Sequence, residues 1–316
     1  MRKYRTLALG AAALVLALSA CAPGGSGSSS TAASGSQSAA KPTVKVGSAG
    51  FYEAAVVGEM YAQALEAKGY TVERNLEIGE RPAVHAAMDS GDANLIPEYL
   101  GGLAAQLTES AELASDPQEA LDNLQEPLAS KEWVAFGFSP GTDADGFAVR
   151  AETAQELGLA TMSDVAEVAN DLRWGVAPGC LENPVCGPGL EEVYGIDLDQ
   201  VAELDNSIDP CSTAMVDALN NDVIDVAQVC TTQPDIVQSN LTLLQDDKSL
   251  QPAQNITAIA TAELADAAPA DFAETLNAIN AALTTEVLTQ LGVEITVNQT
   301  SLADAARAFL EDNSLL

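Results

Sequence analysis

Basic residues are scarce in this sequence, which has 13 Lys and Arg against 46 Asp and Glu and a formal net charge of -33 at pH 7. Such a surface repels nucleic acid and anionic lipid, which argues against both as partners. A cationic or zwitterionic small ligand would suit this charge, but a solvated acidic extracellular surface explains it more simply. Charge therefore narrows the choice of partners without defining a site.

Catalytic motifs are also sparse. The sequence has a single histidine, His85, and contains no H-E-x-x-H zinc motif, no P-loop and no G-x-G-x-x-G after a strand. His85 lies inside an Ala-rich segment of helical character, where an imidazole more often packs or caps than catalyses. Carboxylate pairs are so frequent in this chain that a single pair does not indicate a catalytic site. We therefore predict that the protein is not an enzyme and holds no cofactor or metal.

An apolar run that could cross a membrane is missing as well. Residues 7–18 form an apolar run of 12 residues behind three basic residues, whereas a spanning helix needs about 20. This pattern is typical of an export signal. The following Leu18-Ser19-Ala20-Cys21 resembles a bacterial lipobox, although an ordinary secretory site with a chance cysteine is the alternative. We predict a signal peptide over 1–21, fatty acids such as palmitate on Cys21, and a lipid-anchored protein on the extracellular face of the cell membrane.

The segment after the signal has too few large apolar residues to fold. Residues 22–42 are rich in Ser, Gly, Ala and Thr, and such a composition cannot offset the entropy lost on ordering. We predict a flexible tether. About 275 residues then remain, enough for one large domain or two smaller ones.

Four cysteines follow Cys21, namely Cys180, Cys186, Cys211 and Cys230. An even number in an exported chain indicates two disulfides, for which three connectivities are open. Their spacing does not resemble that of a zinc site. We predict the pairs Cys180 with Cys186 and Cys211 with Cys230.

Strand and helix patterns alternate along the rest of the chain. We predict strands at 43–47, 70–76, 93–96, 133–138, 146–149, 172–176, 223–229 and 241–245. We predict helices at 53–68, 82–89, 163–170 and 213–220, and a mostly helical end from 262 with a short strand at 295–297. This alternation is typical of βαβ units and predicts a largely parallel α/β sheet.

The middle of the chain, about 147 to 250, has strands and helices of its own, which indicates a second lobe inserted into the first. Ligands of open α/β sheets bind beyond the carboxyl ends of the strands. The loops after Gly47, Ile96 and Val229 are therefore the places where we expect the functional residues.

Three segments carry a resemblance to a known family. They are Gly47-Ser48-Ala49-Gly50-Phe51-Tyr52-Glu53, Glu59-Met60-Tyr61-Ala62-Gln63-Ala64-Leu65-Glu66 and Ile96-Pro97-Glu98-Tyr99-Leu100-Gly101-Gly102. They resemble the motifs G-S-K-x-F-x-E-Q, G-E-x-Y-A-Q-A-L-E and Y-P-E-Y-T-G-T of the OpuAC-type substrate-binding proteins, which serve glycine betaine, choline and osmoprotectant ABC importers. Further similarity at 146–150, 219–221, 231–232 and 244–248 extends the resemblance over nearly all of 43–316.

The resemblance implies a two-lobed fold like that of the type II periplasmic binding proteins, with a ligand cleft between the lobes. Lobe I would comprise 43–145 and 252–316, and lobe II 146–251. The crossings at 143–146 and 251–255 would be hinges that close the lobes over a solute. The partners implied are a betaine-like solute and the permease and ATPase of an ABC importer, with the protein itself a monomer.

A quaternary ammonium has no N–H to donate, so aromatic faces must hold it, each contributing about 0.5–2 kcal/mol. Tyr99 and Phe147 are the expected ring contacts, and polar donors are expected at Ser48, Thr231 and Thr232. The full set of candidate ligand-binding residues is Ser48, Phe51, Tyr52, Glu53, Tyr99, Asp145, Phe147, Thr231 and Thr232. The alternative for each ring is that it fills the core at a strand end.

Several positions depart from the family motifs. Ala54 stands where the family has Gln, Gly102 where it has the last Thr of P-E-Y-T-G-T, and Phe147 in place of a tyrosine. Cys230 falls near a family segment that carries an aromatic residue. These departures leave open a different small polar or aromatic solute. A cell-wall enzyme or adhesin is a third hypothesis, which the missing motifs and the 4% aromatic content oppose.

Overall fold

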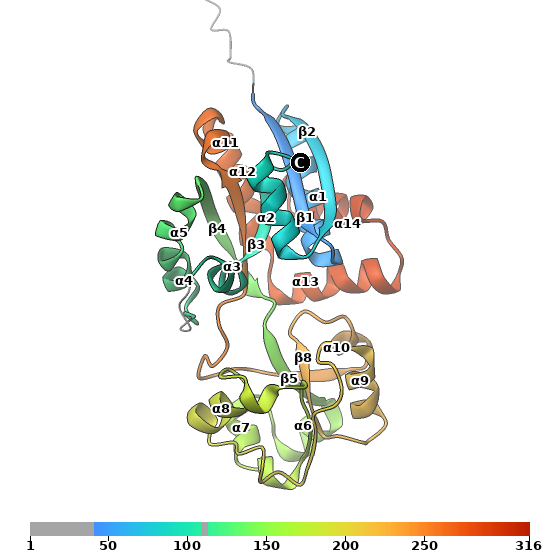
Figure 1. The fold of residues 1–316 in the computed structure, drawn as a ribbon. Coiled ribbons are helices and arrows are strands. Elements are labelled where there is room, and N and C mark those ends of the chain that lie inside the picture. The colour runs from blue at the N-terminus through green and yellow to red at the C-terminus, as the bar shows by residue number, and fades with distance from the viewer. Residues whose placement is uncertain (1–40, 109–112) are drawn as a thin grey trace, which may run out of the picture. The chain divides into compact units, whose positions relative to one another are not determined.

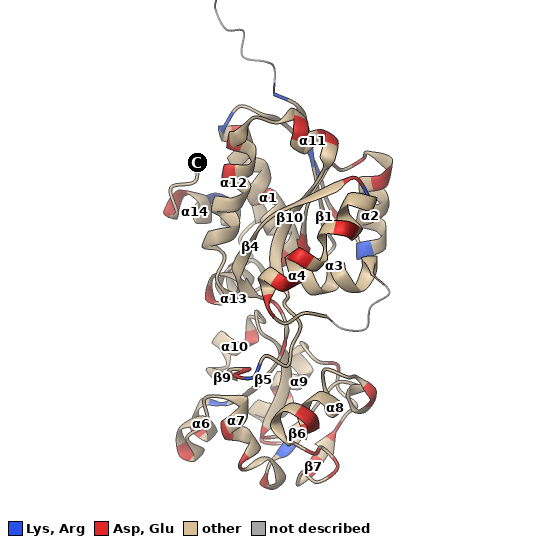
Figure 2. Cartoon of the chain, turned by 90° about the vertical axis from the view of Figure 1, so that its left-hand side faces the viewer, with Lys and Arg blue, Asp and Glu red and all other residues tan. Residues whose placement is uncertain are grey.

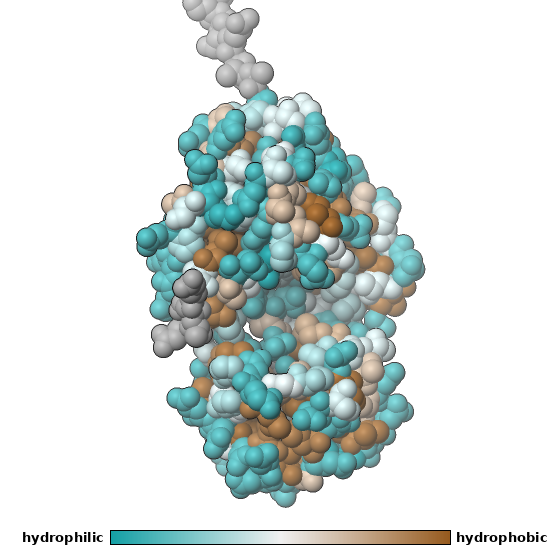
Figure 3. Space-filling view, in the orientation of Figure 1, coloured by the Kyte–Doolittle hydropathy of each residue, from teal (hydrophilic) through white to brown (hydrophobic). Residues whose placement is uncertain are grey.

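The computed structural model describes residues 41–108 and 113–316, which belong to one compact unit. The predicted signal peptide, Cys21 and residues 22–40 of the predicted tether lie outside the described residues. Among the helices described, none is long and apolar enough to cross a membrane. Acidic residues are spread over helices and loops throughout this part of the chain (Figure 2), and hydrophilic residues predominate on the face shown in Figure 3.

The first lobe is built on a five-stranded sheet with the order β2-β1-β3-β10-β4 (Figure 1). Its strands are β1 (Thr43–Ala49), β2 (Thr71–Gly79), β3 (Leu95–Tyr99), β4 (Trp133–Thr142) and β10 (Asn255–Thr261). Its helices are α1 (Tyr52–Ala67), α2 (Arg81–Ser90), α3 (Leu100–Leu107), α4 (Pro117–Asn123), α5 (Gln125–Ser130), α11 (Ala262–Ala267), α12 (Ala270–Ala282), α13 (Thr285–Gly292), η4 (Val293–Val297) and α14 (Leu302–Asp312).

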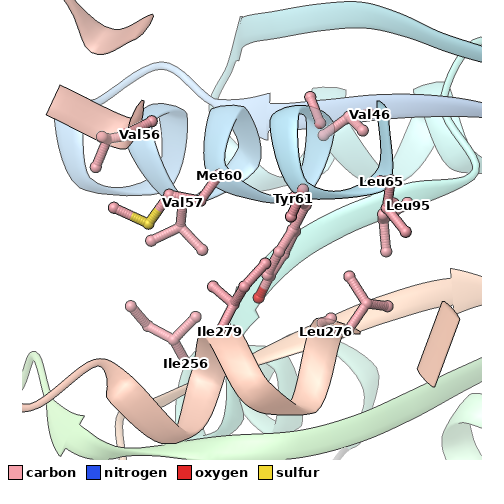
Figure 4. Packing of buried hydrophobic residues seen from close by; sticks show 14 of the residues in the cluster. Val46, Val56, Val57, Met60, Tyr61, Leu65, Leu95, Ile256, Leu276 and Ile279 are labelled. Carbon is pink, nitrogen blue, oxygen red and sulfur yellow. The ribbon is translucent and has the colours of Figure 1, made fainter. Parts of the chain in front are cut away.

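Helix α1 forms the centre of the first core. Residues 53–65 are buried all round the helix, Glu53, Glu59 and Gln63 included, and the helix lies against β1, β2, α12 and α14. Figure 4 shows side chains of α1, including Met60 and Tyr61, close to Leu276 and Ile279 of α12. The buried Tyr61 hydroxyl donates to Asn280 Oδ1 at 2.6 Å, so its polar atom is satisfied. This packing fixes the N-terminus of α1, where several predicted site residues lie.

The second lobe has its own five-stranded sheet, with the order β7-β6-β8-β5-β9. Its strands are β5 (Asp145–Arg150), β6 (Arg173–Gly175), β7 (Glu203–Asp205), β8 (Val226–Cys230) and β9 (Leu241–Leu244). Its helices are α6 (Ala151–Leu157), α7 (Met162–Ala166), η1 (Ala169–Asp171), η2 (Cys180–Glu182), α8 (Gly187–Gly189), η3 (Leu190–Tyr194), α9 (Thr213–Asn220) and α10 (Asp235–Gln238). The fully buried Trp174 belongs to a separate hydrophobic core.

The prediction of a largely parallel sheet was wrong, because both sheets are mixed. Strand β10 runs antiparallel to β3 and β4, and β5 runs antiparallel to β8 and β9. The short strand predicted at 295–297 was also wrong. Those residues belong to η4, which continues directly from α13, and Ile295 packs against the first core. Tertiary packing here overrides the strand preference of β-branched residues.

Two segments carry the chain between the sheets. Residues 143–144 join β4 to β5, and residues 245–254 join β9 to β10. The backbone N–H of Asp143 donates to the carbonyl of Gln254 at 3.1 Å, so the two crossings contact each other. The positions predicted as hinges, 143–146 and 251–255, lie on or beside these crossings.

The four cysteines form the disulfides Cys180–Cys186 and Cys211–Cys230, the pairing favoured by the sequence. The second one ties the end of β8 to the loop before α9. Asp145 lies within 4.8 Å of its two sulfur atoms. Because both sulfurs are bonded to each other, they offer no thiolate to a metal.

Asp225 holds two arginines beside the second sheet, and its removal should destabilise this lobe. It accepts from Arg173 Nη2 at 2.7 Å and Arg150 Nη2 at 3.0 Å. The bonds from Arg173, and secondarily from Arg150, lower the pKa of Asp225 to about 2 against the cost of burial. We expect Asp225→Asn to lower the free energy of unfolding at pH 7 by about 1.5–3 kcal/mol, as for hydrogen bonds to charged groups.

Denaturant unfolding of both proteins checks this, with Asp222→Asn as the matched control. Asp222 also pairs with Arg173 and Arg150, but its side chain is 74% exposed, so its loss should change stability by less than about 0.5 kcal/mol. A depressed pKa stabilises the fold above the unfolded value, about 3.9 for Asp. The difference between the wild type and Asp225→Asn should therefore shrink as the pH falls from about 4 to about 2. Equal effects of the two variants would contradict the assignment.

Candidate functional site

The candidate site lies where α1 begins, β3 ends and the loop after β8 meets the crossing at Asp143. Tyr99 is the last residue of β3, and Glu53 is in the first turn of α1. The Tyr99 hydroxyl donates to Glu53 Oε1 at 2.7 Å, and both residues are buried. The adjacent parallel strands β1 and β3 thus deliver a phenol and a carboxyl to the same edge of the sheet.

Glu53 is 1% exposed, and its second oxygen, Oε2, has no hydrogen-bond partner among the residues described. Burial, and secondarily the negative charge of Asp143, raise the pKa of Glu53 to about 8. Burial raises the pKa of Asp143 too. None of the ion pairs found within 41–108 and 113–316 involves Glu53, Asp143 or Asp145. The site therefore concentrates buried acidic groups without a basic partner.

Thr232 connects this acidic group to the second lobe. Its hydroxyl donates to Asp143 Oδ1 at 2.7 Å, and its carbonyl accepts a long bond from the Tyr52 hydroxyl at 3.4 Å. Thr231 has a different role, because its hydroxyl accepts from the Ala144 N–H and donates to the Thr142 carbonyl. Thr231 thus fixes the crossing, whereas Thr232 belongs to the site itself.

Aromatic rings lie beside the carboxyls. The ring of Phe51 is 5.9 Å from that of Tyr99, tilted by 35°, and Phe51 is 44% exposed, unusual for a large apolar side chain. A small cavity of about 80 Å³ is lined by both rings and by Arg81 and Glu98. The site thus presents both an exposed and a buried ring.

Four of the nine predicted residues lie elsewhere, among them Thr231, which fixes the crossing. Ser48 is fully buried and its hydroxyl accepts from the Glu77 N–H, which holds β2 against β1. Phe147 is buried in the second core, with its ring 5.5 Å from that of Trp174. Asp145 lines a separate cavity of about 420 Å³ together with Thr231, and burial raises its pKa. The structure thus gathers Phe51, Tyr52, Glu53, Tyr99 and Thr232, and places the other four, Ser48, Asp145, Phe147 and Thr231, apart.

Two features that could suggest hydrolysis have structural roles instead. Gly137-Phe138-Ser139-Pro140-Gly141 matches G-x-S-x-G, but it lies within β4, where Ser139 is fully buried and donates to the Gly141 carbonyl. A nucleophile elbow needs an exposed serine at a turn from strand to helix. The sole imidazole, His85, is buried with Nε2 2.9 Å from Glu98 Oε1 and its ring edge-on to Trp133.

Asp143 and Arg81 lie at the site but are not among the predicted binding residues. No motif marks Asp143, which the sequence predicts only as part of a crossing. Arg81 begins α2, and its Nε donates to both oxygens of Glu98 at 2.9 and 3.0 Å. Two signals were available, namely the proline that follows Arg81 at a helix start and the Glu98 of the Pro-Glu-Tyr segment.

Comparisons with known proteins agree with this organisation. The family described as "Substrate binding domain of ABC-type glycine betaine transport system" matches residues 42–312. The chain is 27% identical over 288 residues to the carnitine transport binding protein OpuCC of Listeria monocytogenes, covering 89% of this chain and 90% of that protein. It is 24% identical to the glycine betaine-binding protein YehZ of Escherichia coli, covering 86% and 91%.

Solved structures show the same fold. A crystal structure described as that of a glycine betaine/carnitine/choline ABC transporter superposes with a TM-score of 0.77 at 26% identity, covering 86% of this chain and 99% of that one. Apo YehZ from Escherichia coli gives a TM-score of 0.77 at 22% identity, covering 87% and 99%. These likenesses confirm the predicted two-lobed α/β fold of the type II periplasmic binding proteins.

Proposed function

Because this chain belongs to the family of substrate-binding domains of ABC-type glycine betaine transport systems, we propose that it captures a small quaternary ammonium solute beside Tyr99 and Glu53. The family is one of transport proteins that bind solutes and do not transform them. The partners are therefore the permease and ATPase of an ABC importer, to which the loaded protein delivers its solute.

The observation that carries the proposal is the buried carboxyl of Glu53, next to Asp143 and without a basic partner. Leaving an ionised carboxyl buried and unpaired is costly, and a bound cation offsets that cost. A trimethylammonium group cannot donate a hydrogen bond through N–H. It is suited to a site that offers negative charge and ring faces, and Phe51 and Tyr99 supply two such faces.

Binding also joins the lobes. Glu53, Tyr52 and Tyr99 come from the first lobe, and Thr232 comes from the loop after β8 in the second. A solute that contacts both sets of residues favours whichever arrangement brings them together, so hinge motion at residues 143–146 and 251–255 closes the protein over it. We further propose that Cys21 carries the lipid that anchors the monomeric protein at the extracellular face of the cell membrane.

Titration calorimetry with quaternary ammonium solutes and their carbon isosteres, which lack the positive charge, tests the proposal. Glycine betaine is compared with 3,3-dimethylbutyrate, and choline with 3,3-dimethylbutanol. Each pair has the same shape and differs in the positive charge. We expect at least one charged solute to bind at least tenfold more tightly than its isostere, because only the cation interacts with the rings and carboxyls. Equal binding within each pair, or no binding of any quaternary ammonium, would contradict the proposal.

The alternative solute class has one observation in its favour. Phe147 packs in the second core, so fewer rings surround the site than the resemblance implied. A thermal-shift screen of betaine, choline, carnitine, ergothioneine, amino acids and phenolics separates the two hypotheses. Stabilisation by an amino acid or phenolic alone would select the alternative.

A further inference from the structure

Arg81 has N–H donors that do not bond to its partner, Glu98. Its contacts to Glu98 are both made by Nε, and no hydrogen bond from Nη1 or Nη2 is found among the residues the structure describes. An arginine has five N–H donors in a rigid fork that matches a carboxylate. Arg81 is 31% exposed and lines the same small cavity as Phe51 and Tyr99. Its free N–H groups are therefore available at the edge of the proposed site.

The guanidinium lies close to Gly102, whose lack of a side chain leaves room for it. A Cβ atom at position 102 would lie 2.4 Å from Nη2, 2.8 Å from Cζ and 2.9 Å from Nη1 of Arg81. Any side chain here would displace the whole guanidinium group. Gly102 is also the position at which the sequence departs from the threonine of the resembling motif. The position of the Arg81 guanidinium thus requires a glycine at position 102.

Tyr99 separates an acidic and a basic part of the site. Its hydroxyl contacts Glu53, while its backbone N–H donates to Glu98 Oε2, the partner of Arg81. Glu98 also contacts His85, so Arg81 is one of several donors on that carboxyl. A solute lying along the Tyr99 ring would meet Glu53 at one end and, at the other, the guanidinium flanked by Glu98 and Glu80. The cavity of about 80 Å³ beside Arg81 has room for a carboxylate, since one water takes about 30 Å³.

From this arrangement, and resting on the proposed function, we infer that Arg81 is a specificity-determining residue that binds the carboxylate of a zwitterionic solute. The protein then selects quaternary ammonium compounds that carry a carboxylate, such as glycine betaine or carnitine, over choline, which has a hydroxyl instead. A bidentate bond from Nη1 and Nη2 is the contact that choline cannot make.

Calorimetry with glycine betaine, carnitine and choline on the full-length wild type and Arg81→Gln tests the inference. We expect the wild type to bind one of the two carboxylates at least tenfold more tightly than choline. Arg81→Gln should weaken binding of that carboxylate about tenfold to hundredfold and change binding of choline by less than about threefold. Arg81→Lys should restore part of the loss, because it keeps the charge and loses the fork.

The outcomes separate this inference from the proposed function. If the wild type binds none of the three solutes, the proposed function fails. If it binds choline as tightly as both carboxylates, or if Arg81→Gln weakens all solutes equally, the proposed function stands and the inference fails. Because Arg81→Gln removes a partner of the buried Glu98, thermal unfolding is measured alongside. Gly102→Ala keeps the arginine but displaces its guanidinium, and it should reduce the same selectivity. Unchanged selectivity in Gly102→Ala would also overturn the inference.

Discussion

Replacing Tyr99 with alanine is expected to weaken binding of the preferred quaternary ammonium solute by about hundredfold in titration calorimetry. Loss of a ring face removes up to about 2 kcal/mol. The buried Glu53 also loses the hydrogen bond that the Tyr99 hydroxyl donates to its Oε1, and leaving a buried acceptor without its donor costs about 1–3 kcal/mol. Since each 1.4 kcal/mol is tenfold in affinity, the two effects together give about two orders of magnitude.

A pair of phenylalanine variants separates the ring from the hydroxyl. Tyr99→Phe keeps the ring face and should weaken binding about tenfold or less. Tyr70→Phe is the matched control, because its hydroxyl also donates to a carboxylate, Asp271 Oδ1, at the same distance of 2.7 Å but in a different part of the first lobe. It should leave affinity unchanged. If Tyr99→Ala binds the solute as the wild type does, the assignment of the site is wrong.

The elements around the site could be predicted where the sequence pattern and the packing agree. The helix predicted at 53–68 is α1, whose apolar residues recur at helical spacing and are buried. Strand β10 was not predicted. Its residues 255–260 are all buried, so the strand lacks the alternation of apolar and polar residues that marks a strand with one exposed face. Because alanine-rich helices follow it directly, this short apolar run could not be distinguished from the helical pattern.

Only part of the site could be predicted, because the sequence does not show toward which core each side chain of a strand points. Tyr99 and Glu53 follow adjacent parallel strands and meet at their carboxyl ends. Phe147 lies one residue from Ala148 on β5, and successive residues of a strand face opposite sides. Phe147 and Val149 join the core around Trp174, while Ala148 joins another cluster. The sequence alone did not tell which face of β5 would meet which core, so the ring was expected at the cleft.

Binding of a quaternary ammonium solute is expected to become tighter as the pH rises toward 8. The pKa of Glu53 is raised to about 8, by burial first and then by Asp143, so the carboxyl of the unliganded protein is largely protonated at pH 6. A cation stabilises the ionised form, and binding therefore releases a proton below pH 8. Linkage gives up to about tenfold in affinity per pH unit below the pKa, and we expect an increase of about tenfold to hundredfold from pH 6 to pH 9 in calorimetry.

The source of this pH dependence can be isolated because the solute does not supply it. A quaternary ammonium is permanently charged, and burial raises the pKa values of Tyr52 and Tyr99 further above this range. Glu53→Gln should therefore flatten the profile and bind more weakly than the wild type at pH 9. A pH dependence that persists in Glu53→Gln would assign the proton to another group, such as Asp143.

The free energy of unfolding provides a second, independent test of the raised pKa of Glu53. A raised folded-state pKa means that ionisation opposes folding, so the cost is absent below the unfolded value of about 4.3 and grows until the pH passes the folded value of about 8. Without solute, Glu53→Gln should be more stable than the wild type at pH 8 by a few kcal/mol, the free energy that corresponds to the pKa shift. At pH 4 the two proteins should be about equally stable. With saturating solute, the difference in unfolding free energy between Glu53→Gln and the wild type at pH 8 should become smaller or change sign. The reason is that the bound cation offsets the carboxylate charge, which only the wild type has. A wild type that is more stable than Glu53→Gln at pH 8 without solute would mean that the ionised carboxyl already has a partner, and the site would then have no need of a cation.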